Sequence, residues 1–136
     1  MRIVNEIWII NASGITLFNL SKDDKIDPLL FGGFFSAIQA FIKNLGETEL
    51  KTLVIGTSKI TVYQGKGGYL FVSRSPQKTK EGEIIENLKL VEAKFFERYQ
   101  GQLDRLVDTR IFQNFGAVIE EIFGDTPEKR TVKALW

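Results

Sequence analysis

Five short segments of the chain carry the apolar, β-branched and aromatic residues that are typical of β-strands. The first two, Ile7–Ile10 and Ile15–Leu20, flank the turn-forming residues Asn11–Gly14 and are therefore predicted to form a hairpin. The other three follow one another closely in the middle of the chain, which predicts a meander: Leu53–Ile55, Ile60–Tyr63 and Tyr69–Val72.

Polar and apolar residues alternate in two of the five segments, Ile15–Leu20 and Ile60–Tyr63. Alternation is typical of a strand with one face in water, so these two are predicted to lie at less buried positions. The three continuous apolar runs are predicted to be buried on both faces. Because a sheet that is buried on both faces needs helices on both, the pattern favours a sheet between two helical layers.

Helical periodicity begins after the hairpin. Asp27 and Pro28 are typical of a helix start and Gly46 of a position just past a helix end, and between them apolar residues recur at intervals of three and four. Phe31 and Phe35 lie at the edge of this stripe and widen it to about 160°. This helix is predicted to be the crossover between the hairpin and the meander.

Two further helical stripes follow the meander, one over residues 84–107 and a shorter one over residues 111–123. Gly101 weakens or ends the first of these helices, and Gly124 stops the second. The predicted order of elements is therefore β-β-α-β-β-β-α-α.

The composition limits the chemistry that this domain can carry. The chain has 136 residues, of which 43% are apolar, and 18 Lys and Arg stand against 17 Asp and Glu, which fits one nearly neutral domain and argues against a nucleic-acid binder. It contains no histidine and no cysteine, so the commonest general base, the usual transition-metal ligands and the cysteine nucleophile are absent. We therefore expect no catalytic residue, no metal site and no cofactor.

Two clusters that resemble ligand sites have simpler interpretations. Gly65, Gly67 and Gly68 join two strands, whereas a phosphate-binding loop leads from a strand into a helix, so these glycines are predicted to form a hairpin turn. Three aspartates before the first helix lack the spacing of a calcium loop and are interpreted as loop and helix-cap residues: Asp23, Asp24 and Asp27.

Nothing in the chain approaches the roughly 20 consecutive apolar residues of a membrane-spanning helix, and we expect a soluble, cytoplasmic protein. Residues 74–80 hold three positive charges and no acid. Such a stretch is compatible with an acidic partner or with peripheral contact to a membrane surface.

Residues 3–124 resemble the longin domain of the longin and roadblock group, in the style of archaeal longin-like proteins. The resemblance rests on the element order, on the opening hairpin of residues 7–18 and on the small and aromatic residues of positions 31–41. It implies an α+β fold in which a five-stranded antiparallel sheet carries one helix on one face and two on the other. It also implies a non-catalytic scaffold, a homo- or heterodimer, that binds a small GTPase, another longin or roadblock protein, or vesicle-trafficking machinery.

The domain boundaries follow from the same resemblance. Residues 1–124 are assigned to one longin-like domain and residues 125–136 to a short C-terminal tail. The tail is too short to be the membrane-fusion helix that follows the domain in larger family members. We therefore expect a stand-alone adaptor or regulator.

Candidate partner-binding residues come from the aromatic content and from the strand edge. Eleven phenylalanines exceed what a core of this size obviously needs, and Phe31 and Phe35 lie where an interface anchor is expected, although they could equally cap the core. Ile60 and Val62 belong to residues 50–63, which are predicted to offer a strand edge. Trp136 is a further candidate, with a frayed terminus as the alternative.

Two other functions stay open at this point. A GTPase-activating protein can act through one arginine that stabilises phosphoryl transfer, and Arg74 and Arg110 are the better-placed arginines, although most arginines are simply exposed. A small-ligand sensor similar to a PAS domain is the other alternative, since a sheet with helices can enclose a pocket.

Overall fold

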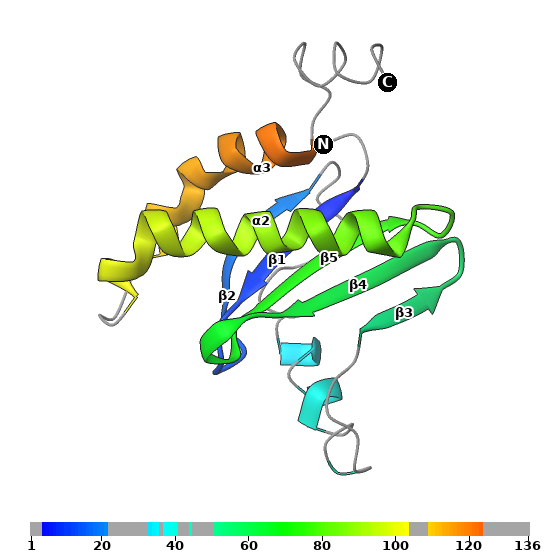
Figure 1. Cartoon of the computed structure of the whole chain (residues 1–136). Helices are drawn as coiled ribbons and strands as arrows, with labels where there is room; N and C mark the ends of the chain where they lie inside the picture. Colours follow the sequence, from blue (N-terminus) through cyan, green and yellow to red (C-terminus); the bar gives the residue numbers. More distant parts are fainter. Residues whose placement is uncertain are drawn as a thin grey trace, which may run out of the picture.

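The computed structural model of the chain describes residues 4–21, 33–35, 37–40, 44, 51–103 and 109–123. Residues 33–35, 37–40 and 44 are helical and are here called the first helix. The remaining elements are five strands, two α-helices and three short 3-10 segments (Figure 1): β1 (Glu6–Ile10), β2 (Thr16–Ser21), β3 (Thr52–Ile55), β4 (Ser58–Gln64), η1 (Lys66–Gly68), β5 (Leu70–Pro76), α2 (Glu81–Tyr99), η2 (Gln100–Gln102), η3 (Thr109–Phe115) and α3 (Gly116–Phe123).

The five strands form one antiparallel sheet in the order β2-β1-β5-β4-β3. The predicted hairpin is β1 with β2, and the predicted meander is β3 with β4 and β5. The first helix lies between β2 and β3 in the chain, and these two strands are the opposite edges of the sheet. The predicted α+β fold and order of elements are therefore confirmed.

Apolar side chains gather in one cluster on each face of the sheet. The face under α2 and α3 combines Ile7, Ile9 and Phe71 with the apolar sides of α2, η3 and α3 (Figure 1). The opposite face holds Phe35 of the first helix together with residues of three strands: Trp8, Ile10, Ile60, Val62, Leu70 and Val72. Because β1 and β5 contribute to both clusters, their predicted burial on both faces is confirmed.

The predicted burial is wrong for the other half of the meander. Residues 53–55, predicted to be buried on both faces, form the edge strand β3, where Val54 and Ile55 are 51% and 52% exposed. Residues 60–63, predicted to be less buried, lie in the interior strand β4, where Ile60, Thr61 and Val62 are all buried. Burial here depends on which strands lie on either side in the sheet. The alternation of polar and apolar residues within one strand does not reveal this.

The two halves of α2 lie against different kinds of side chain. In the C-terminal half, the ring centroid of Phe95 lies 5.3–6.1 Å from those of five other rings: Phe71, Phe96, Tyr99, Phe112 and Phe115. Nearer the start of α2, the same face of β4 and β5 carries three buried hydroxyls that form no hydrogen bond within the described residues: Thr61, Ser73 and Ser75. Aromatic packing therefore anchors one half of α2 and an unsatisfied polar strip underlies the other.

The glycines between β4 and β5 form the predicted turn. Gly67 and Gly68 have φ values of 68° and 78°, which favour glycine, and η1 connects two strands. A Cβ on Gly68 would lie 3.0 Å from the Cβ of Ala12, so the two hairpin loops approach each other closely here.

Predictions for the C-terminal helices hold in part. Helix α2 ends at Tyr99, before the predicted limit of its stripe, and residues 104–108 lie outside the described ranges. Residues 111–115, predicted as α-helix, belong to η3, because repeats of 3.0 and 3.6 residues are hard to distinguish over one or two turns. No helix of the described ranges is long and apolar enough to cross a bilayer.

Candidate protein interface

The two edge strands differ in what covers them. On β2, the ring of Phe18 meets that of Phe115 edge to face, with 5.7 Å between their centroids, and η3 packs against the strand. On β3, Val54 and Ile55 are half exposed although both are large and apolar. One face of β2 is thus covered by η3, whereas β3 presents half-exposed apolar side chains.

The backbone of β3 also faces outward at alternate residues. The Val62 N–H donates to the Lys51 carbonyl at 2.8 Å, and Leu53 is paired with Ile60. In an antiparallel pair of strands, the backbone groups of alternate residues point toward the partner strand. Those of Lys51 and Leu53 therefore point toward β4, and those of Thr52 and Val54 point away from it. The β3 edge therefore offers hydrogen-bonding groups as well as apolar side chains.

The first helix contributes one exposed aromatic residue, which is Phe34 and not the predicted Phe35. Phe34 is 51% exposed, and its ring meets that of Phe35 at a centroid distance of 6.5 Å. Phe35 is fully buried in the cluster against which Leu53 of β3 packs. Phe34 therefore lies one residue from the side chain that joins the first helix to this part of the sheet.

The predicted exposure of the surplus phenylalanines is corrected by their burial. The structure describes nine of the eleven phenylalanines, and all of these except Phe34 are buried. Phe31 lies outside the described residues, as does Trp136. The buried face of the first helix is hard to assign where phenylalanines are adjacent, because a shift of one residue turns a side chain by about 100° around the helix axis.

Ile60 and Val62 are also not at the edge where they were placed. They are 4% and 3% exposed, and their strand β4 pairs with β3 on one side and β5 on the other. A partner reaching the sheet from this side meets β3 first. The exposed residues of this edge, Val54 and Ile55, were not predicted. The only indication of them in the sequence is that they end a short apolar segment.

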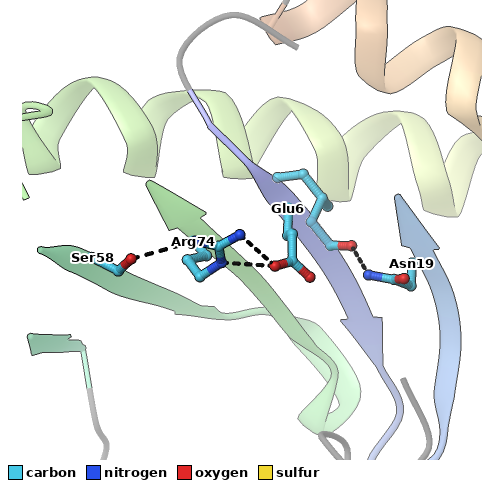
Figure 2. A network of polar contacts seen from close by, with 5 residues as sticks. Glu6, Asn19, Ser58 and Arg74 are labelled. Carbon is cyan, nitrogen blue, oxygen red and sulfur yellow. Dashed lines mark hydrogen bonds and ion pairs between the residues drawn. The ribbon is translucent and has the colours of Figure 1, made fainter. Parts of the chain in front are cut away.

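Arg74 is turned into the sheet, toward a buried carboxylate (Figure 2). Its Nε and Nη2 both lie 2.7 Å from Oε1 of Glu6, and Nη1 donates to the Ser58 hydroxyl at 3.4 Å. The Glu6 side chain is 1% exposed, and its Oε2 has no hydrogen-bond partner within the described residues. Reaching a partner's nucleotide would require Arg74 to abandon a buried charge, so this geometry gives Arg74 a structural role.

Arg110 has a different setting. It lies in η3 and is exposed. It also takes part in an interaction within the chain. The structure does not bring Arg110 together with Arg74, which lies on β5.

A separate polar contact fixes the β4–β5 loop to α2. The Glu92 carboxylate accepts hydrogen bonds from the Tyr63 hydroxyl at 3.1 Å and from the Lys66 N–H at 2.8 Å. Burial raises the pKa of Tyr63, and the hydrogen bond to Glu92 and its charge add to this. A side chain at position 65 would crowd Oε2 of Glu92 and the ring of Phe71, so glycine favours this contact.

The hollows of the surface bear on a small-ligand function. One of about 280 Å³ lies between the first helix and the two hairpin loops and is lined by Asn11, Gln39, Gln64 and Leu70, among others. Two others, of about 380 and 300 Å³, lie beside α2, so all three are near the lower limit of ligand pockets. Within the described residues no group of three His, Cys, Asp or Glu could hold a metal ion. The exposed apolar side chains and outward backbone groups of β3 are therefore the better candidate site.

Comparison with known proteins places the fold. No family model matches the chain, and no curated protein matches it in sequence. Among solved structures, MglB of Myxococcus xanthus aligns with a TM-score of 0.53 and 15% identity over 70% of this chain and 85% of that chain. The fold is longin-like.

Two other solved structures are similar to a lesser degree. A gliding protein MglB from Thermus thermophilus has a TM-score of 0.44 and 20% identity over 63% of this chain and 70% of its own. An MglB with a tetrameric arrangement has a TM-score of 0.46 and 19% identity over 70% of this chain and 76% of its own.

Proposed function

We propose that this protein is a non-catalytic binding module that regulates a small GTPase, directly or by pairing with a second longin-fold protein. The observation that carries the proposal is the β3 edge, where Val54 and Ile55 are half exposed beside outward-facing backbone groups. The GTPase as partner follows from the resemblance to longin and roadblock proteins, and the longin-like fold supports it.

Strand addition explains how such an edge binds. An incoming strand gains backbone hydrogen bonds along β3, and pockets for alternate side chains give selectivity. Phe34 supplies an exposed aromatic side chain of the kind that anchors interfaces, and its neighbour Phe35 belongs to the cluster against which Leu53 of β3 packs. Together they offer the two components of a peptide-strand interface, a ladder and an anchor.

A proline at Val54 tests the ladder. Because the Val54 N–H faces away from β4, Val54→Pro removes an outward donor and leaves the β3–β4 pairing intact. We expect V54P to stay folded by circular dichroism but to lose self-association in sedimentation and capture of a GTPase loaded with a non-hydrolysable GTP analogue. Val54→Thr keeps the N–H and is the matched control. Unchanged association and unchanged capture in folded V54P would contradict the proposal.

The anchor is tested separately. Phe34→Ser removes the exposed ring, whereas Phe34→Leu keeps an apolar side chain of similar reach. We expect the first to weaken partner binding by tenfold or more and the second to have a small effect, since truncated aromatic anchors cost about 2 kcal/mol or more. Equal binding by both variants would remove Phe34 from the interface.

Acceleration of GTP hydrolysis is a second candidate function, favoured by the exposure of Arg110 in η3. An inserted arginine raises GTPase turnover by about 10³–10⁵-fold. If Arg110 acts in this way, Arg110→Lys abolishes the acceleration but not GTPase binding, because lysine keeps the charge but loses the planar fork. Turnover of the captured GTPase with and without this protein decides the matter.

A further inference from the structure

One end of the molecule combines exposed apolar side chains with lysines. The end of β3 and the β3–β4 turn, together residues 54–57, lie beside the loop that leads from β5 to α2, residues 77–80 (Figure 1). The two are joined by a hydrogen bond of 2.9 Å from the Gln77 N–H to the Thr57 carbonyl, and the Lys59 ammonium donates to the Thr79 carbonyl. We call residues 54–57 and 77–80 together the tip.

The apolar side chains of the tip project on both faces of the sheet. Thr52 pairs with Thr61 and Leu53 packs on the cluster of the first-helix face, so alternation places Ile55 on that face and Val54 on the α2 face. Both are half exposed, and Gly56 with φ 60° makes the two-residue turn beyond them. The tip is thus a narrow finger with apolar residues on both sides.

Positive charge surrounds this finger. Lys78 and Lys80 are exposed within the tip, and Lys59 flanks it on β4. Two acids, Glu81 and Glu83, lie in the first turn of α2, so among the residues described at this end of the molecule the three lysines stand against two carboxylates. The charge of Arg74 does not add to this sum because Glu6 pairs with it.

We propose that the tip binds an anionic membrane surface, with Val54 and Ile55 entering the interfacial region and Lys78 and Lys80 contacting lipid headgroups. A finger with apolar residues on two opposite faces is covered by a fluid layer that surrounds it, whereas a flat protein surface covers one face. Flexible lysines suit headgroups that have no fixed geometry. This binding is additional to the proposed regulatory function and does not depend on it.

Vesicle sedimentation tests the proposal. The full chain is mixed with phosphatidylcholine vesicles that contain either no anionic lipid or about 30% phosphatidylserine, a content that gives the surface a clear negative potential. We expect binding to the anionic vesicles that weakens as salt is raised, and much weaker binding to the neutral ones. Equal binding to both, or no binding to either, overturns the proposal.

Matched variants locate the binding surface. Removing charge with Lys78→Gln and Lys80→Gln should reduce binding by about fivefold for each lysine, and Val54→Ser with Ile55→Ser should reduce it by about tenfold or more. The controls are Leu90→Ser and Lys94→Gln on α2, where Leu90 is 51% exposed and the Lys94 side chain 57%. Control variants that lose as much binding as the tip variants overturn the proposal.

Two substitutions at one position separate this proposal from the strand-addition interface. Val54→Pro keeps an apolar side chain but loses the outward N–H, so vesicle binding persists while strand pairing fails. Val54→Ser together with Ile55→Ser keeps the N–H groups but loses the apolar surface, so vesicle binding fails. If the serine variant instead loses a protein partner while the wild type never binds vesicles, the tip is a protein contact and the membrane proposal is overturned.

Discussion

Strands β2 and β3 lie at the two edges of one sheet, and they differ in what lies beyond them. One face of β2 is covered by η3, with Phe115 meeting Phe18. The edge at β3 carries Val54 and Ile55 in half-exposed positions, with neither proline nor a charged residue among its four positions. Natural proteins usually protect an edge strand, so an apolar edge left open is expected to have a partner. Strand β2 thus contributes its apolar side chains to the core, whereas β3 keeps some of its own available for binding.

The largest effect is expected from removing the cover of β2. Phe115 is fully buried and contacts Phe18, Phe95 and Tyr99. Phe115→Ala should lower the free energy of unfolding by about 3–5 kcal/mol, because it removes a large core side chain and leaves a cavity. Urea denaturation measures this loss, and a change below about 1 kcal/mol would show that β2 does not depend on this cover.

The link between the central strands should come next. Arg74→Met leaves Glu6 as a buried charge without its partner and should cost about 3 kcal/mol. The double variant Glu6→Leu with Arg74→Met removes both charges and should recover most of the loss. Urea denaturation of the three proteins gives the coupling, and an equally unstable double variant would mean that packing, not charge, is the cause.

A smaller effect is expected beside the open edge, where the Tyr63 hydroxyl holds Glu92. The pKa of Tyr63 is raised, so the folded state favours its protonated form. The resulting stabilisation of the fold is present below pH 10 and is lost as the pH rises through the folded-state pKa. Tyr63→Phe should cost about 0.5–1.5 kcal/mol at pH 7. Above pH 10 the difference between the two proteins should shrink, which thermal unfolding at several pH values measures.

The smallest effect on stability is expected at the open edge itself. Val54→Lys replaces a half-exposed side chain and should change the free energy of unfolding by no more than about 0.5 kcal/mol. It should nevertheless abolish self-association through β3, because a lysine on an edge strand opposes pairing. Large loss of stability in V54K would show that β3 is covered like β2 and would cancel the contrast.

Local patterns predicted the elements better than their positions in the sheet. The turn residues after Ile10 and the continuous apolar runs of β1 and β5 carry their structure locally, and both were predicted. An apolar run is ambiguous, however, because the same Leu53, Val54 and Ile55 suit a doubly buried strand and an open edge.

Contacts between distant residues explain what else escaped prediction. Glu6 and Arg74 are 68 positions apart, and only the register of β1 with β5 brings their side chains together. Read alone, Arg74 looks like a surface arginine in a loop, whereas it is the counter-charge of a buried acid. The face of the first helix escaped for a different reason, since adjacent aromatic residues allowed Phe35 to be placed at the edge of the apolar stripe, whereas it is the buried residue and Phe34 the exposed one.

Motion in α2 should begin at its N-terminal half. The three buried hydroxyls of Thr61, Ser73 and Ser75 forgo hydrogen bonds to water without gaining them inside, so separating this half from the sheet recovers hydration. The other half would have to break the ring contacts of Phe95. We therefore expect amide hydrogens in the first turns of α2 to exchange with solvent before those around Phe95, so that the helix opens from one end while the fold persists.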